Sequence, residues 1–152
     1  MSETFMTSSV ERISVGGMSS DTAPAPVLNA LSIVARDMAE TVAFYRRCGL
    51  AFAAGAEEAP HAEATAGGIR ILVDTREVVE SFTPGWSEPA GGHRMALAFE
   101  CATPAAVDEH HARLVAAGHR SHREPFDAVW GQRYAVVLDP NDNPVDFYCA
   151  LA

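Results

Sequence analysis

The chain has 152 residues, of which 48% are hydrophobic, a size that fits one ordinary domain or two small repeats sharing a core. Its 20 acidic and 11 basic residues give a net charge of −9, and every basic residue other than histidine is an arginine. This charge repels nucleic acid phosphates and anionic lipid, so we expect neither a nucleic acid nor a membrane as a partner.

The cysteines and the N-terminus indicate a location. Cys48, Cys101 and Cys149 are odd in number and lack CxxC spacing, which favours a reducing compartment over a disulfide framework or a zinc ribbon. Residues 1–26 have no basic start followed by an apolar run, so we expect a flexible N-terminal extension rather than a secretory signal. No stretch approaches the ~18 apolar residues of a membrane span. We therefore expect a cytoplasmic protein.

The first half of the remaining chain predicts strand, helix, strand, strand, strand. Residues 27–36 alternate as a strand does, and Asp37 follows as a helix N-cap with Glu40 three residues on. Gly49 supplies the helix stop. Three further strand candidates are "LAFAAGAEE" (50–58), "HAEATA" (61–66) and "IRILVD" (69–74).

The second half repeats this order. Residues 94–101 predict a strand, Thr103 an N-cap, and Pro104 the first position of a helix that ends at Gly118. Three strands follow, at 119–129, 132–139 and 145–151, the last two joined by the turn "PNDN". We divide the chain into module one (27–82), a Pro- and Gly-rich linker (83–92) and module two (93–152).

Two segments carry a family resemblance: "DMAETVAFYRRCGL" after the first strand and "VLDPNDNPVDFY" near the end. With the duplicated order, they resemble the vicinal oxygen chelate superfamily of glyoxalases, extradiol dioxygenases, fosfomycin-modifying enzymes and bleomycin-resistance proteins, over residues 27 to 151. The resemblance implies an α+β fold in which two tandem βαβββ modules form curved mixed sheets around a concave ligand cup. It also implies a homodimer.

The alternation within the strands fits a sheet with one face under helices and one open face. The larger side chains, expected under the helices, are Leu31, Ile33, Met95, Leu97, Phe99, Val145 and Phe147. Small side chains alternate with them on the first strand of each module and leave room for a ligand cup.

The metal site of the resembling enzymes is not matched. Their ligands come from the first and last strands of each module, and these positions fall here on Ala30, Arg70, Arg94 and Asp146. Alanine offers no ligand atom and arginine has no lone pair to give, so we expect no metal ion and no other cofactor. His93 is one residue from a ligand position, and a strand bulge that turned it inward would restore a site.

Asp146 falls on the open face, and two interpretations of it stay open. In one, Arg94 or Arg70 neutralises the carboxylate where a metal would lie, because a buried carboxylate needs a partner. Replacing Asp146 with Asn should then lower thermal stability without any metal dependence. In the other, Asp146 is solvated and the arginines are surface charges.

Aromatic residues of "EPFDAVWGQRY" (124–134) would border the cup: Phe126, Trp130 and Tyr134, beside Gln132 and Arg133. They suit a small organic ligand, or alternatively close the barrel or a dimer seam. The histidines are less informative. We expect His110 and His111 on a solvated helix face, His119 and His122 on the surface, and His61 at the edge of the cup.

The resemblance and the unmatched metal positions predict a small-molecule-binding protein, similar to bleomycin-resistance proteins, that sequesters or carries a small aromatic or cationic organic ligand without metal. Such a role would include antibiotic resistance. The alternative is a metal-dependent glyoxalase-like lyase or dioxygenase, and whether the chain is an enzyme stays open. The expected ligand-binding residues are Ala30, Ser32, Arg70, Arg94, Trp130, Arg133, Asp146 and Tyr148.

Overall fold

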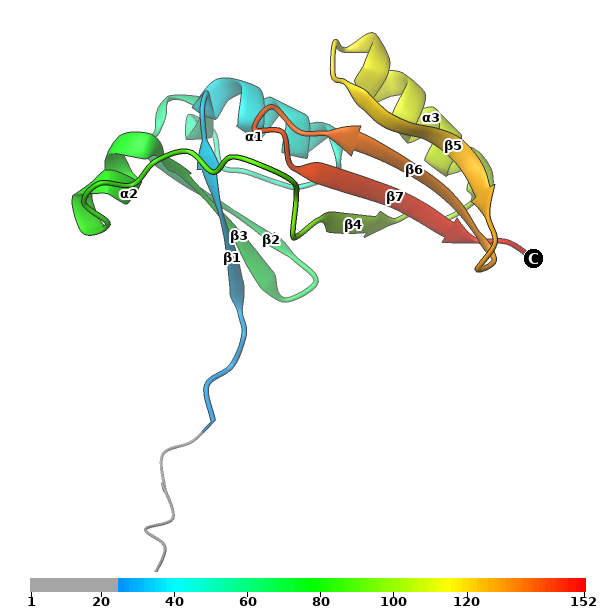
Figure 1. Ribbon diagram of the computed structural model, residues 1–152, viewed down its shortest axis with the longest axis horizontal. Helices are drawn as coiled ribbons and strands as arrows, with labels where there is room; N and C mark the ends of the chain where they lie inside the picture. Colours follow the sequence, from blue (N-terminus) through cyan, green and yellow to red (C-terminus); the bar gives the residue numbers. More distant parts are fainter. Residues whose placement is uncertain (1–24) are drawn as a thin grey trace, which may run out of the picture.

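The computed structural model describes residues 25–152, which form two mixed β-sheets (Figure 1). The first sheet has the order β1-β3-β2, with β1 (Ala30–Ala35), β2 (His61–Ala66) and β3 (Ile69–Thr75). The second has the order β4-β7-β6-β5, with β4 (Leu97–Glu100), β5 (Ser121–Ala128), β6 (Gln132–Leu138) and β7 (Pro144–Ala150). In each sheet the strands that come first and last in the sequence, β1 with β3 and β4 with β7, pair in parallel. The other pairs are antiparallel. The predicted α+β fold with tandem modules is confirmed.

Both long helices begin where their caps were predicted. Asp37 accepts a hydrogen bond from the Glu40 amide at 2.8 Å and starts α1 (Met38–Arg47), which Gly49 follows with a φ of 95°. Thr103 accepts from the Ala106 amide at 3.1 Å and starts α3 (Pro104–Ala116). No helix in the described part of the chain is both long and apolar enough to cross a membrane.

Module one departs from the prediction in two places. Residues 50–58 are not a strand: Phe52 alone forms a bridge, to Ala64, and the short 3₁₀ helix η1 (Ala56–Glu58) follows. The run is rich in alanine and lacks the β-branched residues that favour pairing. An unpredicted helix, α2 (Arg76–Phe82), follows β3 directly, because the Thr75 side chain caps it by accepting from the Val78 amide.

The segment between the modules also differs from expectation. The strand predicted from residue 94 begins only at Leu97, so Met95, expected under a helix, is 69% exposed. Trp86 lies half-buried beside α2, with the Arg76 guanidinium 5.7 Å from its ring centre. The predicted extension at residues 1–26 lies outside the described residues, except for its last two.

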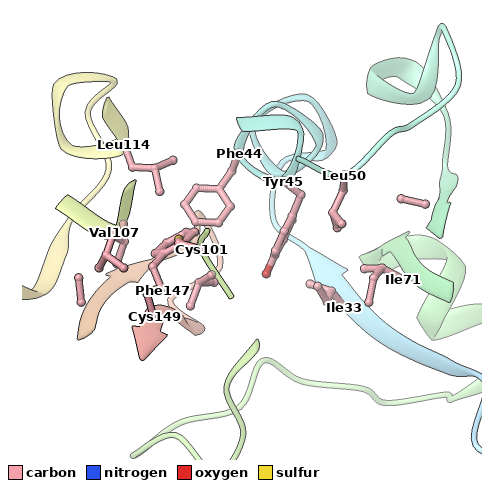
Figure 2. Packing of buried hydrophobic residues seen from close by; sticks show 14 residues of the cluster. Ile33, Phe44, Tyr45, Leu50, Ile71, Cys101, Val107, Leu114, Phe147 and Cys149 are labelled. Atoms are coloured by element: carbon pink, nitrogen blue, oxygen red, sulfur yellow. The ribbon is translucent and has the colours of Figure 1, made fainter. Parts of the chain in front are cut away.

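One hydrophobic core serves both modules. Phe44 and Tyr45 of α1 are fully buried, and Figure 2 shows them between side chains of the two halves. Ile33 and Ile71 belong to the same cluster from the first sheet, as does Phe147 from the second. Cys101 and Cys149 are also buried in this cluster.

A buried hydrogen bond lies at the centre of this junction. The Tyr45 hydroxyl donates to Asp139 Oδ2 at 2.7 Å, and only 3% of the Asp139 surface is exposed. Asp139 also accepts from the backbone amides of Asn141 and Asn143, at 2.8 Å each, and from the Asn143 side chain at 2.9 Å. The carboxylate therefore shapes the β6–β7 turn and ties it to helix α1.

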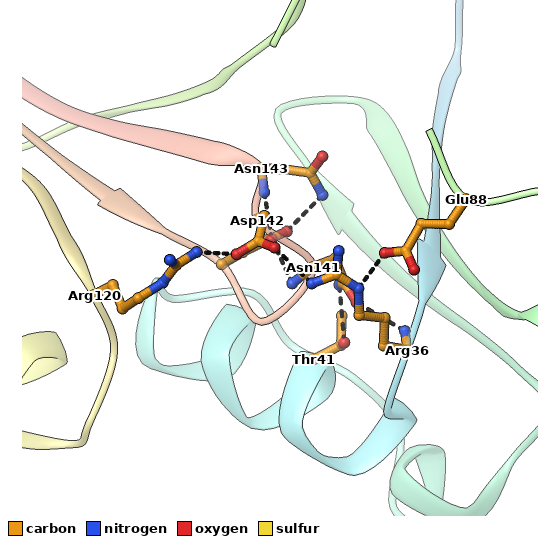
Figure 3. Close-up of polar contacts among 8 residues, drawn as sticks. Arg36, Thr41, Glu88, Arg120, Asn141, Asp142 and Asn143 are labelled. Carbon is orange, nitrogen blue, oxygen red and sulfur yellow. Dashed lines mark hydrogen bonds and ion pairs between the residues drawn. The ribbon is translucent and has the colours of Figure 1, made fainter. Parts of the chain in front are cut away.

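Polar contacts of the same turn reach back to the first module (Figure 3). The Arg36 amide donates to Asn141 Oδ1 at 2.8 Å, and the Asn141 amide group donates to the Thr41 hydroxyl at 3.1 Å. Asp142 binds the guanidinium groups of both Arg36 and Arg120. The hydrogen bond from Arg36 holds the pKa of the Asp142 carboxyl below its ordinary value. The sequence "DPNDN" thus joins the two modules.

Replacing Tyr45 with Phe should lower the free energy of unfolding by about 1–3 kcal/mol, because Asp139 then loses a buried donor while the ring still fills the core. Urea denaturation of the two proteins measures the difference. The matched control is Tyr148→Phe, whose hydroxyl makes no hydrogen bond to any described residue. An equal effect of both substitutions would contradict the junction role of the Tyr45 hydroxyl.

Candidate functional site

Each sheet has one face against helices and one open face. On β7, Val145, Phe147 and Cys149 are buried, while Asp146 and Tyr148 alternate with them and are partly exposed. The first sheet shows the same alternation, with buried core residues on one side of each strand. Of the expected ligand-binding residues, Ala30, Ser32 and Arg70 lie on the open face of the first sheet, and Trp130, Asp146 and Tyr148 lie on the second.

Aromatic side chains gather on the open face of the second sheet. We call Phe126, Trp130, Tyr134 and Tyr148 the aromatic surface. Its ring centres are separated by 5.6 Å for Trp130 and Tyr134, 6.2 Å for Phe126 and Trp130, and 6.3 Å for Tyr134 and Tyr148. Cross-strand pairing of Tyr134 with both Phe126 and Tyr148 sets this arrangement. Trp130 is 60% exposed, so the surface is accessible to a ligand.

Asp146 lies beside the aromatic surface and binds a tyrosine instead of an arginine. The Tyr134 hydroxyl donates to Asp146 Oδ2 at 2.6 Å. Burial, and then the hydrogen bond to Asp146, raise the pKa of Tyr134 above its ordinary value. The hypothesis that Arg70 or Arg94 neutralises Asp146 is wrong: among residues 25–152 Asp146 forms no ion pair, Arg70 lies 3.4 Å from Glu63, and Arg94 is exposed. The Asp146 carboxylate, which has no cationic partner among the described residues, thus borders the aromatic surface.

The strand registers also correct the position equivalent to Asp146. Ser32 and Ala98 each lie five residues before the N-cap of the following helix. Ser32 pairs with Leu72 across β1 and β3, and Ala98 pairs with Asp146 across β4 and β7. The counterpart of Asp146 in module one is therefore Leu72, two residues from Arg70.

At that position Leu72 offers no metal ligand, and Asp146 offers a single carboxylate. In residues 25–152, no group of three or more histidine, cysteine or acidic side chains is arranged to hold a metal ion. The donor set around Asp146, a tyrosine hydroxyl and a single carboxylate, does not fit the site of the metal-dependent relatives implied by the sequence.

Arg133 lies away from the other expected ligand-binding residues. It alternates with Tyr134 on β6 and so faces α3, where it donates to both carboxylate oxygens of Asp108 at 2.8 and 3.0 Å. It also donates to Asp127 at 3.0 Å. The bidentate contact between Arg133 and Asp108 attaches α3 to the second sheet. Arg94 is separate as well, since it precedes β4 in an irregular segment.

The open face of the first sheet carries a polar network that the sequence interpretation missed. We call Ser32, His61, Glu63, Arg70 and Asp74 the His61 network. The buried Asp74 accepts from the Ser32 hydroxyl at 3.2 Å and contacts His61 Nδ1 at 2.6 Å. His61 Nε2 is 3.2 Å from Glu63, which Arg70 contacts in turn. The hydrogen bonds to Asp74, and then to Glu63, raise the pKa of His61 above its ordinary value.

A signal for this network was present in the sequence. Gly67 and Gly68 have φ values of 55° and 84°, as a two-residue hairpin turn requires. That turn pairs Ala66 with Ile69 and therefore places His61 directly opposite Asp74. Counting outward from the two glycines would have found the pair.

Three of the histidines are less exposed than predicted. His111, expected on a solvated helix face, is buried with Nε2 2.8 Å from the Ser121 hydroxyl. His110 stacks on Phe147 with ring centres 5.7 Å apart. His119 makes an edge contact with Phe44 at 4.8 Å. The predictions failed for His110 and His111 because their side of α3 packs on the sheet, and for His119 because the segment after α3 packs against Phe44 of α1.

The His61 network should make stability depend on pH. The folded state raises the pKa of His61 above 6.5, so its contribution is fully present below pH 6.5 and is lost as the pH rises through the folded value. The effect is moderated by solvent, because 43% of the His61 side chain is exposed. Urea midpoints measured from about pH 5 to about pH 9 should show this loss.

The His61→Gln variant should lack that component of the pH dependence, whereas His122→Gln, an exposed histidine outside the network, should keep it. If the His61→Gln variant shows the same pH dependence of the urea midpoint as the wild type, the assignment to His61 is wrong.

Comparison with known proteins identifies the family and the fold. The glyoxalase/bleomycin resistance protein/dioxygenase superfamily matches residues 27–147. Among solved structures, a family enzyme from Burkholderia phytofirmans PsJN is 24% identical, with a TM-score of 0.72 over 82% of this chain and 98% of that one. A search of curated proteins finds no match.

Two further solved structures share the fold. Lactoylglutathione lyase from Agrobacterium tumefaciens is 20% identical, with a TM-score of 0.59 over 84% of this chain and 96% of that one. TioX from Micromonospora sp. ML1 is 23% identical, with a TM-score of 0.57 over 83% of this chain and 100% of that one. With the family match over most of its length, this chain belongs to the glyoxalase/bleomycin resistance protein/dioxygenase superfamily.

Proposed function

We propose that this protein binds a small cationic organic molecule, aromatic in part, on the open face of its second sheet and without a metal ion. The observation that carries the proposal is the aromatic surface beside a carboxylate that has no cationic partner among the described residues. Aromatic faces attract cations, and Asp146 offers the matching negative charge. Such a protein would sequester or carry its ligand.

The remaining polar groups are placed to orient such a ligand. The Tyr134 hydroxyl holds one oxygen of Asp146 and leaves the other free to accept a hydrogen bond from a ligand. The Trp130 Nε1 donates to Gln132 at 2.8 Å, which orients the exposed indole. The net charge of −9 favours approach of a cation.

We further propose that the protein acts as a homodimer, since the aromatic surface is open in one chain. Ligand sites bury most of a small molecule's surface, and a second copy would supply the opposite wall. Val129, which is fully exposed beside Trp130, favours an additional contact there. Sedimentation velocity measures the mass: a dimer is the expected outcome, and a monomer at all concentrations would contradict this part of the proposal.

Binding can be measured through Trp130. The chain has two tryptophans, so the Trp86→Phe variant leaves Trp130 as the single fluorescent reporter. Titration with cationic aromatic compounds should quench or shift its emission, and neutral analogues of the same shape should bind more weakly. In this background, Asp146→Asn should weaken binding of the cation by about tenfold or more, while the Asn oxygen still accepts from Tyr134.

Asp127→Asn is the matched control, because it makes the same chemical change on strand β5, which β6 separates from β7, at a carboxylate that binds Arg133. Its affinity for the cation should equal that of the parent. If both substitutions weaken binding alike, long-range charge explains the attraction and the proposed contact with Asp146 is wrong.

The absence of metal from the proposed function is testable separately. Purified protein incubated with Ni²⁺, Zn²⁺, Mn²⁺ or Fe²⁺ and then desalted should retain less than one ion per chain. Its affinity for the organic cation should not change. A stoichiometric ion that is lost on Asp146→Asn substitution would favour the glyoxalase-like lyase or dioxygenase instead.

A further inference from the structure

Two cavities lie on the helix side of the molecule, away from the aromatic surface. The smaller has a volume of about 170 Å³ and is lined by Arg47 of α1 and by His110, Arg113 and Leu114 of α3. The larger, of about 420 Å³, shares Arg47 and extends toward His119 and the β6–β7 turn. Arg47 therefore connects the two.

The smaller cavity gathers positive charge in an acidic protein. Most described arginines lie within ion-pair distance of a carboxylate; these are Arg36, Arg46, Arg70, Arg76, Arg120 and Arg133. Within residues 25–152, Arg47 and Arg113 form no ion pair with a carboxylate, and no acidic residue lines the smaller cavity. Two guanidinium groups on different helices thus face one space with their charge uncompensated.

His110 adds a directed hydrogen-bond donor to this space. Arg113 Nη2 lies 2.9 Å from His110 Nδ1 and 3.5 Å from its Nε2, and with the nearer Nδ1 as the acceptor the ring hydrogen is assigned to Nε2. Burial, and then the charge of Arg113, lower the pKa of His110, which keeps the imidazole neutral. Stacking on Phe147 with an interplanar angle of 4° fixes the ring plane.

We propose that Arg47, Arg113 and His110 bind a phosphate group in the smaller cavity. Guanidinium groups match the oxygens of phosphate through paired hydrogen bonds, and the imidazole donor supplies a third direction. A volume of about 170 Å³ is below the range of ~300–1,000 Å³ that complete small-molecule sites occupy, which fits a single anionic group.

The larger cavity accommodates the rest of a phosphorylated small molecule. His119 lines it together with the acidic residues Glu40, Asp139 and Asp142. Their carboxylates accept hydrogen bonds from ligand hydroxyl groups. The ligand class is therefore a phosphomonoester with hydroxyl groups.

This site is independent of the proposed cation binding. Phe147, on which His110 stacks, faces the helices, whereas Asp146 and Tyr148 on the same strand face the open side. Loss of one site should leave the other intact, so failure of either proposal can be recognised separately.

Calorimetric titration with inorganic phosphate, glycerol 3-phosphate and glycerol tests the inference at constant ionic strength. Wild-type protein should bind inorganic phosphate, bind glycerol 3-phosphate more tightly, and not bind glycerol. Arg47→Gln and Arg113→Gln should each weaken binding of both phosphates by about tenfold or more. Arg94→Gln, which removes an exposed arginine elsewhere in the chain, should have no effect.

A second measurement uses the wild-type chain alone and does not depend on how the variants fold. The NMR signals of the His110 ring should shift on addition of phosphate, while those of the exposed His122 should not. Binding of phosphate no tighter than chloride, or equal affinity in all three arginine variants, would overturn the site. Equal affinity for inorganic phosphate and glycerol 3-phosphate would overturn the role of the larger cavity.

Discussion

The hydrogen bond from Tyr45 to Asp139 is the interaction on which the arrangement of the two modules depends. A buried carboxylate is costly unless its oxygens are satisfied, and Asp139 uses a hydroxyl from one module and backbone amides from its own turn. Because α1 is packed between the sheets, the same contact fixes where both open faces lie. The geometry available to any ligand follows from this junction.

The two modules share a fold and carry different chemistry on equivalent faces. The first sheet has a connected set of ionisable groups centred on His61 and Asp74, whereas the second has aromatic rings around a single carboxylate. Leu72 and Asp146 occupy equivalent positions and have no chemistry in common. The buried faces can be similar because packing alone constrains them, while the open faces are free to diverge.

The sequence was sufficient for the features that depend on local rules. Asp37 and Thr103 cap helices where expected, and alternation placed Asp146 on the open face, because both depend on a few adjacent residues. Contacts between strands depend on the register in which the strands pair, and a single sequence does not specify that register. The contact between Tyr134 and Asp146 depends on the β6–β7 pairing. The predicted contact of Arg70 with Asp146 failed because the residue of module one equivalent to Asp146 is Leu72, two residues after Arg70.

The shared core has a consequence for how such a chain could arise. Either module alone would expose core side chains that the shared cluster now buries, Phe44 in one module and Phe147 in the other, so it would need a second copy of itself to be stable. Gene duplication and fusion would then convert a symmetric pair into one polypeptide. Each half could then acquire its own substitutions on the open face of its sheet without disturbing the shared core.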